Sequence, residues 1–204
     1  MASRWQVVLG LTAVGIAAAP PIVYTSQHGV QFRNLRVVTE GVLYRSGQLT
    51  PDGLKRVIHE KGLRTVVTLR TSRVAGRASP DAWEEEMCAA RGVRHVRIVP
   101  RLWSPDEAGD VPADEAVREF LAVMDDKANY PVLVHCFAGV HRTGTMCSVY
   151  RMEYDRWPCE RAIEEMRTCG FDPIDMRDNI AEYLRGYQPR WKRAGSERAA
   201  GRIE

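Results

Sequence analysis

The most informative segment of the chain is Pro131-Val-Leu-Val-His-Cys-Phe-Ala-Gly-Val-His-Arg-Thr-Gly144. A short apolar run after a proline is typical of a buried strand, and the residues that follow the glycine have the pattern of a helix. Cys136 is therefore expected at the end of a strand and Arg142 in the first turn of a helix. In this order of strand, loop and helix, the free amides of the loop and of the helix amino terminus converge on a bound anion.

The spacing between Cys136 and Arg142 is weak evidence by itself, because Cys88 and Arg94 have the same spacing. The second pair has a different context. Cys88 falls inside an expected helix, and the chain between it and Arg94 runs from that helix into a strand. The structural context of the first pair, and not its spacing, indicates a functional site.

The residue types in the loop suit attack on a phosphoryl group. A thiol beside converging amides and a guanidinium is expected to ionise and to act as a nucleophile. The planar fork of Arg142 can bind two phosphoryl oxygens at once, and Gly139 allows the backbone amides to turn inward. Thr143 is expected to donate its hydroxyl to the departing sulfur, and His135 to hold the loop by hydrogen bonds to the backbone. The expected phosphate-binding residues are Phe137, Ala138, Gly139, Val140, His141 and Arg142.

Two other interpretations of the segment are disfavoured. A buried cysteine with an accidental arginine does not account for the whole string. A zinc site built from His135, Cys136, His141 and Cys147 matches no common ligand spacing and leaves Arg142 beside the cation. No metal and no cofactor are therefore expected.

Around this segment, short apolar runs alternate with amphipathic stretches, which predicts an α/β domain with helices packed on a central sheet. Strands are expected at 37–38, 42–44, 64–70, 93–99 and 131–136. Helices are expected at 51–61, 79–91, 112–127, 141–157, 158–168 and 175–187. Thr50 should cap the first of these helices and Gly62 should end it. The segment 100–111 has two prolines and a glycine and is expected to be a loop.

The string HCFAGVHRTG resembles the phosphate-binding loop HCxxGxxRTG of the cysteine-dependent protein tyrosine phosphatase superfamily, in particular its compact dual-specificity branch. The segment Leu43-Tyr-Arg-Ser-Gly-Gln48 and the strand at 64–70 are similar to the atypical dual-specificity group, so that the resemblance covers about residues 35–170. It implies a mixed central sheet flanked by helices. It also implies metal-independent hydrolysis of phosphate monoesters through a cysteinyl-phosphate intermediate, on phosphotyrosine, phosphoserine, phosphothreonine or a small phosphorylated molecule.

The family that the chain resembles also uses an aspartic acid on a mobile loop to protonate the leaving oxygen, about thirty residues before the cysteine. Asp106 lies 30 residues before Cys136, after Trp103 and within the expected loop. It is therefore the expected general acid. Asp110 and Glu107 lie on the same loop and remain alternatives.

An active phosphatase is favoured because a nucleophile, an arginine, a hydroxyl and an acid occur together. A catalytically silent phosphate-binding module is the second possibility, and a rhodanese-like sulfurtransferase is disfavoured by Thr143 and by the separate acid loop. The loop carries no lysine, which gives no support to recognition of a dense polyanion. Arg73, Arg77 and Arg101 follow strands and are candidates for positive charge at the mouth of the site.

The amino-terminal segment is apolar, with no charged residue from Trp5 to Tyr24. Twenty such residues are long enough to span a bilayer as a helix, so residues 1–27 are expected to form a single-pass membrane anchor of unknown orientation. Two alternatives remain: a signal peptide cleaved after Ala19, which gives a secreted enzyme, and a helix packed on the domain. Pro20 directly after the cut makes cleavage unfavourable.

The remaining composition is that of an ordinary globular protein. Apolar residues make up 45% and charged residues 27%, which excludes a disordered chain and a fibrous rod. The five cysteines are odd in number and lack CxxC spacing, so they indicate neither a disulfide framework nor a zinc ribbon. From Arg185 onward, the chain contains six basic residues and two acidic residues. We expect a phosphatase domain at 30–188, a solvated basic tail at 189–204 and no nucleic-acid partner.

Overall fold

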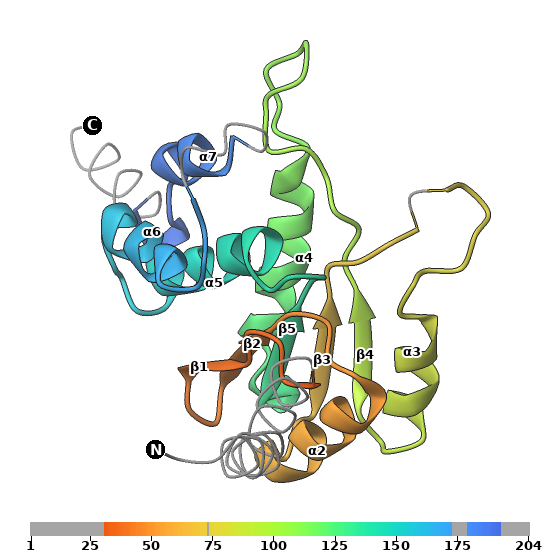
Figure 1. The fold of residues 1–204 in the computed structure, drawn as a ribbon. Coiled ribbons are helices and arrows are strands. Elements are labelled where there is room, and N and C mark those ends of the chain that lie inside the picture. The colour runs from red at the N-terminus through yellow and green to blue at the C-terminus, as the bar shows by residue number, and fades with distance from the viewer. Residues whose placement is uncertain (1–30, 73, 173–178, 193–204) are drawn as a thin grey trace, which may run out of the picture.

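A five-stranded sheet forms the centre of the fold, which is seen in a computed structural model that describes residues 31–72, 74–172 and 179–192 (Figure 1). The strand order is β1-β2-β5-β3-β4. β1 runs antiparallel to β2, and the other neighbouring strands are parallel, so the sheet is mixed as expected. The strands are β1 Arg36–Thr39, β2 Leu43–Ser46, β3 Thr65–Thr68, β4 Arg94–Arg97 and β5 Val132–His135.

The four parallel strands end level with one another. His135, the last residue of β5, pairs with Ser46 of β2 and with Thr68 of β3, and Thr68 in turn pairs with Arg97 of β4. The loops that follow these strands therefore leave the sheet at one edge. In α/β folds this carboxyl edge is where ligands bind, and Cys136 lies on it.

Each face of the sheet packs against its own group of helices (Figure 1). Because side chains alternate along a strand, Val132 and Val134 point to one face, whereas Leu133 and His135 point to the other. On the first face, α4 Ala113–Asp125 and α5 His141–Glu153 share one apolar cluster with α6 Cys159–Arg167 and α7 Ile180–Gly186, which pack against α5. The second face is covered by α2 Pro51–Lys61 and α3 Ala82–Ala89.

The ends of the helices follow the local sequence. The hydroxyl of Thr50 accepts a hydrogen bond from the amide of Gly53, and Gly62 ends α2 in the left-handed conformation with φ of 58°. Both expectations for this helix are confirmed. α5 stops at Glu153, four residues earlier than expected, before Arg156 adopts a φ of 55° that no helix continues.

Other helices are also shorter than the sequence pattern indicated, among them α3, which spans Ala82–Ala89 where residues 79–91 were expected. α4 ends at Asp125, because the side chain of Asp126 accepts a hydrogen bond from the amide of Ala128 and starts the separate turn η1 Lys127–Asn129. α7 starts at Ile180, and residues 175–178 of the helix expected there lie outside the described part of the chain.

The expectation of a single-pass membrane anchor is corrected by the structure. Within residues 31–72, 74–172 and 179–192, no helix has both the length and the apolar character needed to cross a bilayer. The apolar helix expected between Trp5 and Tyr24 lies outside the described residues.

The beginning of the expected basic tail contacts the domain. Arg190 forms ion pairs with Glu153 of α5 at 3.0 Å and with Asp125 of α4 at 2.7 Å. The indole nitrogen of Trp191 donates a hydrogen bond to the carbonyl oxygen of Met152. These contacts attach residues 190 and 191 to the helical side of the sheet, and residues 193–204 lie outside the described part.

Candidate active site

Cys136 directly follows β5 and is 5% exposed. Its sulfur accepts a hydrogen bond from the amide of Gly139 at 3.3 Å. Arg142 lies in the first turn of α5, and its guanidinium donates to the carbonyl oxygen of Leu69 beyond the end of β3 at 3.2 Å. The structure therefore has the predicted order of strand, loop and helix, with the sulfur and a loop amide in contact.

The loop from Cys136 to Val140 is held from outside by its carbonyl oxygens. In a trans peptide the N–H group points away from the preceding C=O, so carbonyls that are bound outside turn the following amides toward the interior of the loop. The contact between the Gly139 amide and the sulfur agrees with this orientation. The carbonyl oxygen of Phe137 accepts a hydrogen bond from the backbone amide of Gln48 at 2.9 Å. That of Ala138 accepts from the side chain of Asn34 at 2.9 Å, and that of Gly139 from the guanidinium of Arg45 at 2.7 Å.

Gly139 is required by both its conformation and its surroundings. Its φ of 75° lies in the left-handed region, and an added Cβ would lie 2.4 Å from the amide nitrogen of Gly47 and 2.6 Å from the carbonyl carbon of Ser46. The backbone of the Ser46–Gly47 peptide leaves no room for a side chain. The loop from Cys136 to Val140 and the segment after β2 are therefore in close backbone contact here.

Gly139→Ala is expected to lower the free energy of unfolding by about 1 to 3 kcal/mol more than a positive φ alone requires, because the new methyl group overpacks the backbone. Gly76→Ala is the matched control, since Gly76 has a φ of 74° and a Cβ added there would meet nothing within 4 Å. Urea unfolding of both variants measures the difference. Equal destabilisation by the two substitutions would contradict the close backbone contact described here.

Several buried polar side-chain atoms near the loop lack hydrogen-bond partners in the described part of the chain. The hydroxyl of Thr143 has no hydrogen-bond partner among the described residues, and neither has Nε nor Nη1 of Arg45. Both residues are at most 2% exposed. Thr143 therefore has a free donor, as the predicted role at the sulfur requires. Arg45 places a buried positive charge next to the loop, and such a charge favours an anion there.

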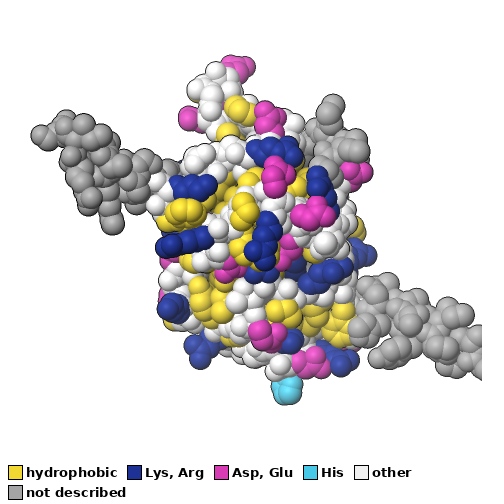
Figure 2. All heavy atoms as spheres, turned by 90° about the vertical axis from the view of Figure 1, so that its left-hand side faces the viewer, with side chains coloured by type: hydrophobic (Ala, Val, Ile, Leu, Met, Phe, Trp, Pro, Cys, Tyr) yellow, Lys and Arg dark blue, Asp and Glu magenta, His cyan; other side chains and the backbone are white. Residues whose placement is uncertain are grey.

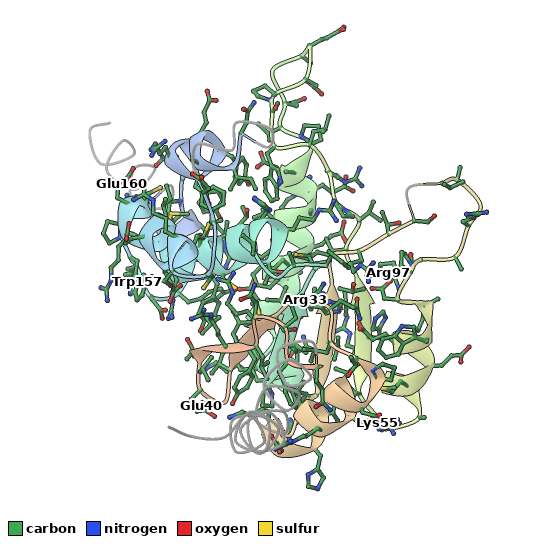
Figure 3. The ribbon with its side chains drawn as sticks, in the orientation of Figure 1. Arg33, Glu40, Lys55, Arg97, Trp157 and Glu160 are labelled. Carbon is green, nitrogen blue, oxygen red and sulfur yellow. The ribbon has the colours of Figure 1, made fainter. Side chains whose placement is uncertain are left out.

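The exposed mouth of the site is formed by Phe137, which is 58% exposed. The guanidinium of Arg33 lies 4.7 Å from the centre of its ring and that of Arg70 lies 5.3 Å away. Arg70 also donates to the side chain of Gln48 at 2.7 Å. Figure 3 places Arg33 near the junction of β5 and α5. Two guanidinium groups thus flank the aromatic ring beside the loop.

The arginines expected at the mouth from the sequence are placed differently. Arg101 forms an ion pair with Glu115 of α4 at 2.6 Å, Arg77 is exposed on the loop between β3 and α3, and Arg73 lies outside the described residues. Sequence reasoning missed Arg33, Arg45 and Arg70. A usable signal existed for Arg70, which follows β3 at the same edge where Cys136 follows β5.

The expected general acid, Asp106, lies on a loop that projects beyond α4 (Figure 1). The projection stands out in the space-filling view, with acidic side chains on it (Figure 2). One carboxylate oxygen of Asp106 accepts hydrogen bonds from the amides of Ala108 and Asp110, at 2.9 and 3.0 Å. The carboxylate therefore closes a turn in its own loop. The structure does not bring Asp106, Glu107 or Asp110 to Cys136.

A cavity of about 720 Å³ lies at the base of this loop, between α4 and α7. The ring of Trp103 packs on that of Tyr183 with centroids 4.9 Å apart, and Asn179 donates to the hydroxyl of Ser104 at 2.7 Å. No residue from Cys136 to Thr143 lines this cavity. The cavity is therefore separate from the candidate active site.

A buried polar cluster lies next to Cys136, on the face of the sheet to which His135 points. Glu84 of α3 is 1% exposed, and its Oε1 lies 2.7 Å from Nε2 of His135 and 3.3 Å from Nε2 of His95. Its Oε2 accepts a hydrogen bond from Gln48 at 2.9 Å. Burial opposes ionisation of Glu84, but His135, His95 and Gln48 together hold its pKa below the usual range. The sequence analysis did not identify Glu84.

Asp81, Glu84 and His135 have ligand atoms within 4.8 Å of one another, a separation that suits a metal ion. However, Asp81 already accepts hydrogen bonds from Thr68 and from Arg97, the latter at 2.7 Å. The oxygens of Glu84 are likewise engaged by donors. The cluster is thus described by its hydrogen bonds, and His141, from the disfavoured zinc set, packs instead against the ring of Phe171.

Other cysteines differ from Cys136 in their surroundings. Burial raises the pKa of the Cys88 thiol to about 12 and that of the Cys147 thiol to about 11, so both remain protonated near neutral pH. Arg94, which has the matching spacing to Cys88, donates instead to Asn129 at 2.8 Å. The second cysteine and arginine pair therefore forms no anion site, and all five cysteines are free.

Comparison with known proteins gives one family match over most of the chain. Residues 15–182 match the profile of a family described as "DSP-PTPase phosphatase fused to NAD+ Kinase". The chain is 36% identical to the dual specificity protein phosphatase TpbA of Pseudomonas aeruginosa over 96 residues, which are 47% of this chain and 42% of the relative. It is 33% identical to the putative tyrosine-protein phosphatase OCA1 of Mycosarcoma maydis over 133 residues, which are 64% of this chain and 76% of the relative.

Solved structures of the same fold exist. The core catalytic domain of the PP-IP phosphatase SIW14 from S. cerevisiae superposes with a TM-score of 0.61 at 19% identity, over 83% of this chain and 95% of that chain. At this identity the similarity shows the fold. The chain spans 15% of the probable chloroplastic NAD kinase 2 of Oryza sativa and 42% of TpbA, which is less than half the length of each of these two relatives.

Proposed function

The chain belongs to the DSP-PTPase phosphatase family whose profile spans residues 15–182, and from this membership we propose that it hydrolyses phosphate monoesters through a phosphorylated Cys136. The observation that carries the proposal is the contact between the Cys136 sulfur and the Gly139 amide, at the carboxyl end of β5 and before the first turn of α5. Amides that point to the sulfur favour its thiolate and can also bind the oxygens of a phosphoryl group.

The proposed reaction has two steps. The thiolate of Cys136 attacks phosphorus, so that an S–P bond forms while the ester P–O bond breaks and the leaving oxygen takes a proton from an acid. Water then attacks phosphorus, loses a proton to the same group and displaces the sulfur. Arg142 binds two phosphoryl oxygens in both steps, and the unpartnered hydroxyl of Thr143 donates to the departing sulfur.

The proposed substrates are phosphorylated proteins or small phosphorylated molecules. Arg33 and Arg70 beside Phe137 support a substrate with negative charge next to the scissile phosphate, since both guanidiniums lie at the mouth of the site. A panel of phosphopeptides, phosphoinositides and inositol phosphates, assayed for released phosphate, identifies the preferred class. One relative is named a putative tyrosine-protein phosphatase, and one solved structure of the same fold is named a PP-IP phosphatase. Comparison of phosphopeptides with inositol phosphates in the panel separates these two possibilities.

Two alternatives are tested by simple assays. Failure to turn over a generic aryl phosphate, together with binding of inorganic phosphate, would support a catalytically silent phosphate-binding module. Transfer of sulfur from thiosulfate to Cys136 would support a sulfurtransferase. Release of phosphate from the aryl ester, sensitive to vanadate, is the result that we expect.

Asp106 is proposed as the general acid, which requires that its loop moves toward the site during the reaction. Asp106→Asn is expected to lower kcat for an alkyl phosphate by a factor on the order of 10² to 10⁴. An aryl phosphate with a good leaving group should lose less, because it needs less protonation. Asparagine keeps the oxygen that accepts from Ala108 and Asp110, so the turn of the loop is preserved.

Asp110→Asn and Glu107→Gln are the matched comparisons, since both residues are exposed on the same loop. Each of these substitutions should have little effect on kcat for the alkyl phosphate and for the aryl phosphate. If Asp110→Asn shows the large, leaving-group-dependent loss and Asp106→Asn does not, the acid is Asp110, whereas the nucleophile and the arginine keep their roles.

A further inference from the structure

The side chain of His135 connects the buried carboxylate of Glu84 to Cys136, the proposed nucleophile. α3 packs against the face of the sheet to which His135 points, and Glu84 and Cys88 are its buried residues. Glu84 contacts His135 through Nε2 at 2.7 Å, and His135 directly precedes Cys136. Its contact with His95 is longer, at 3.3 Å, so His135 is the closer of its two histidine partners.

Both ring nitrogens of His135 face oxygen acceptors. Nε2 faces the carboxylate of Glu84, and Nδ1 lies 3.3 Å from the carbonyl oxygen of Cys136. A carbonyl oxygen accepts but cannot donate, and the same holds for an ionised carboxylate. A neutral imidazole has a single N–H and can satisfy only one of these contacts. Only the doubly protonated ring donates to both.

We propose that Glu84 is a positioning residue for the proposed phosphatase reaction: its carboxylate keeps His135 as an imidazolium, which binds the carbonyl of Cys136 and stabilises the thiolate. This inference rests on the function proposed above. The ring is 2% exposed, so a charge in it is weakly screened by water and needs a counter-charge. Glu84 supplies that counter-charge, and the hydrogen bond from Nδ1 fixes the peptide that begins the phosphate loop.

Other groups around Glu84 do not replace its charge. Asp81, the residue directly before the same helix, accepts hydrogen bonds from Arg97 and Thr68. Cys88 is a neutral thiol near neutral pH because burial raises its pKa to about 12. From the sheet, His95 of β4 faces the same oxygen as His135, and the uncharged side chain of Gln48 faces the other oxygen. Glu84 is thus the carboxylate that contacts His135.

The unmodified protein provides the first test. In protein labelled with ¹⁵N histidine, both ring nitrogens of His135 should appear protonated at pH 7.5, where an ordinary histidine with a pKa near 6.5 is mostly neutral. Assignment of the signal uses its loss in His135→Gln. A single protonated nitrogen at this pH would overturn the proposal.

The second test replaces the charge with an isosteric amide. In Glu84→Gln, the imidazolium loses its counter-charge and the thiolate loses the nearby positive charge. The ascending limb of the plot of kcat/KM against pH should therefore move to higher pH by about one unit. Below the original midpoint the rate should fall about tenfold. The pH dependence of Cys136 alkylation by iodoacetamide should shift in the same direction without any substrate present.

Glu85→Gln is the matched control, because the adjacent Glu85 undergoes the same chemical change on the exposed side of α3. Its pH profile and alkylation should coincide with those of the parent. Loss of activity in Glu84→Gln with an unshifted pH profile would mean a purely structural role and would overturn the inference. If the variant does not fold, as judged by circular dichroism, the histidine spectrum of the parent decides.

The inference and the proposed function fail in distinguishable ways. A parent protein that turns over no phosphate ester contradicts the proposed function. A parent that turns over phosphate esters but has a neutral His135, or a Glu84→Gln profile equal to that of Glu85→Gln, contradicts the role of Glu84 alone.

Discussion

Replacement of Cys136 by serine is expected to abolish turnover while oxyanion binding is retained. Serine preserves the shape of the loop and can accept the hydrogen bond that Gly139 donates to the sulfur. Its hydroxyl, however, is hardly ionised near neutral pH, so the covalent step is lost. We expect kcat to fall by a factor on the order of 10⁵ to 10⁶, as when other covalent nucleophiles are removed.

The measurement combines the rate with an aryl phosphate and the affinity for vanadate or inorganic phosphate by calorimetry. Cys159→Ser is the control, because Cys159 is a half-buried free cysteine at the start of α6, in the helical half of the domain. It should keep the rate of the parent. Substantial turnover by Cys136→Ser would disprove the cysteinyl-phosphate mechanism.

Arg142→Ala is expected to lose both turnover and oxyanion binding. In the proposed mechanism the guanidinium binds two phosphoryl oxygens, and in the structure it also joins the start of α5 to the carbonyl oxygen of Leu69. A transition-state arginine in phosphoryl transfer contributes a factor on the order of 10³ to 10⁵ to kcat, and we expect a loss in this range together with weaker phosphate binding.

Arg142→Lys separates charge from shape. Lysine keeps the positive charge but cannot form two parallel hydrogen bonds, so it should recover part of the phosphate affinity and little of the rate. Arg64→Ala is the matched control, since Arg64 is exposed before the amino end of β3, at the opposite edge of the sheet. Full recovery of kcat by Arg142→Lys would show that the fork geometry is unimportant.

The positions of Cys136 and Arg142 in the fold could be predicted because their arrangement is local. Fourteen consecutive residues contain the strand, the loop and the first helical turn, and the structure places β5 and α5 at these positions. Helix α2 was likewise predicted correctly from Thr50 and Gly62, whose effects depend only on neighbouring residues.

The supports of the loop could not be predicted, because they come from distant parts of the chain. Asn34, Arg45 and Gln48 reach the loop only when β2 pairs with β5, and Glu84 reaches His135 only when α3 packs on the sheet. The acid loop shows the same limit. Asp106 was selected by its distance from Cys136 along the sequence. That distance does not reveal that the carboxylate of Asp106 accepts hydrogen bonds from amides of its own loop.

Hydropathy alone led to the membrane anchor, which the described structure does not support. An apolar segment such as Trp5 to Tyr24 has the same signal whether it crosses a bilayer or packs on protein. Amphipathic patterns in described helices such as α2 and α4 are more informative, because each of these helices buries one face and exposes the other.

The external bonds that hold the phosphate loop also determine when it can form. Its carbonyls bind Asn34 and Arg45, which are 104 and 94 residues away along the chain. Contacts between residues so far apart in the sequence form late in folding, because closing such long stretches of chain costs conformational entropy first. During synthesis, the segment 34–48 emerges long before its partners exist. The proposed phosphate site therefore needs the completed chain, and an oxyanion bound there is expected to stabilise the whole domain rather than one loop.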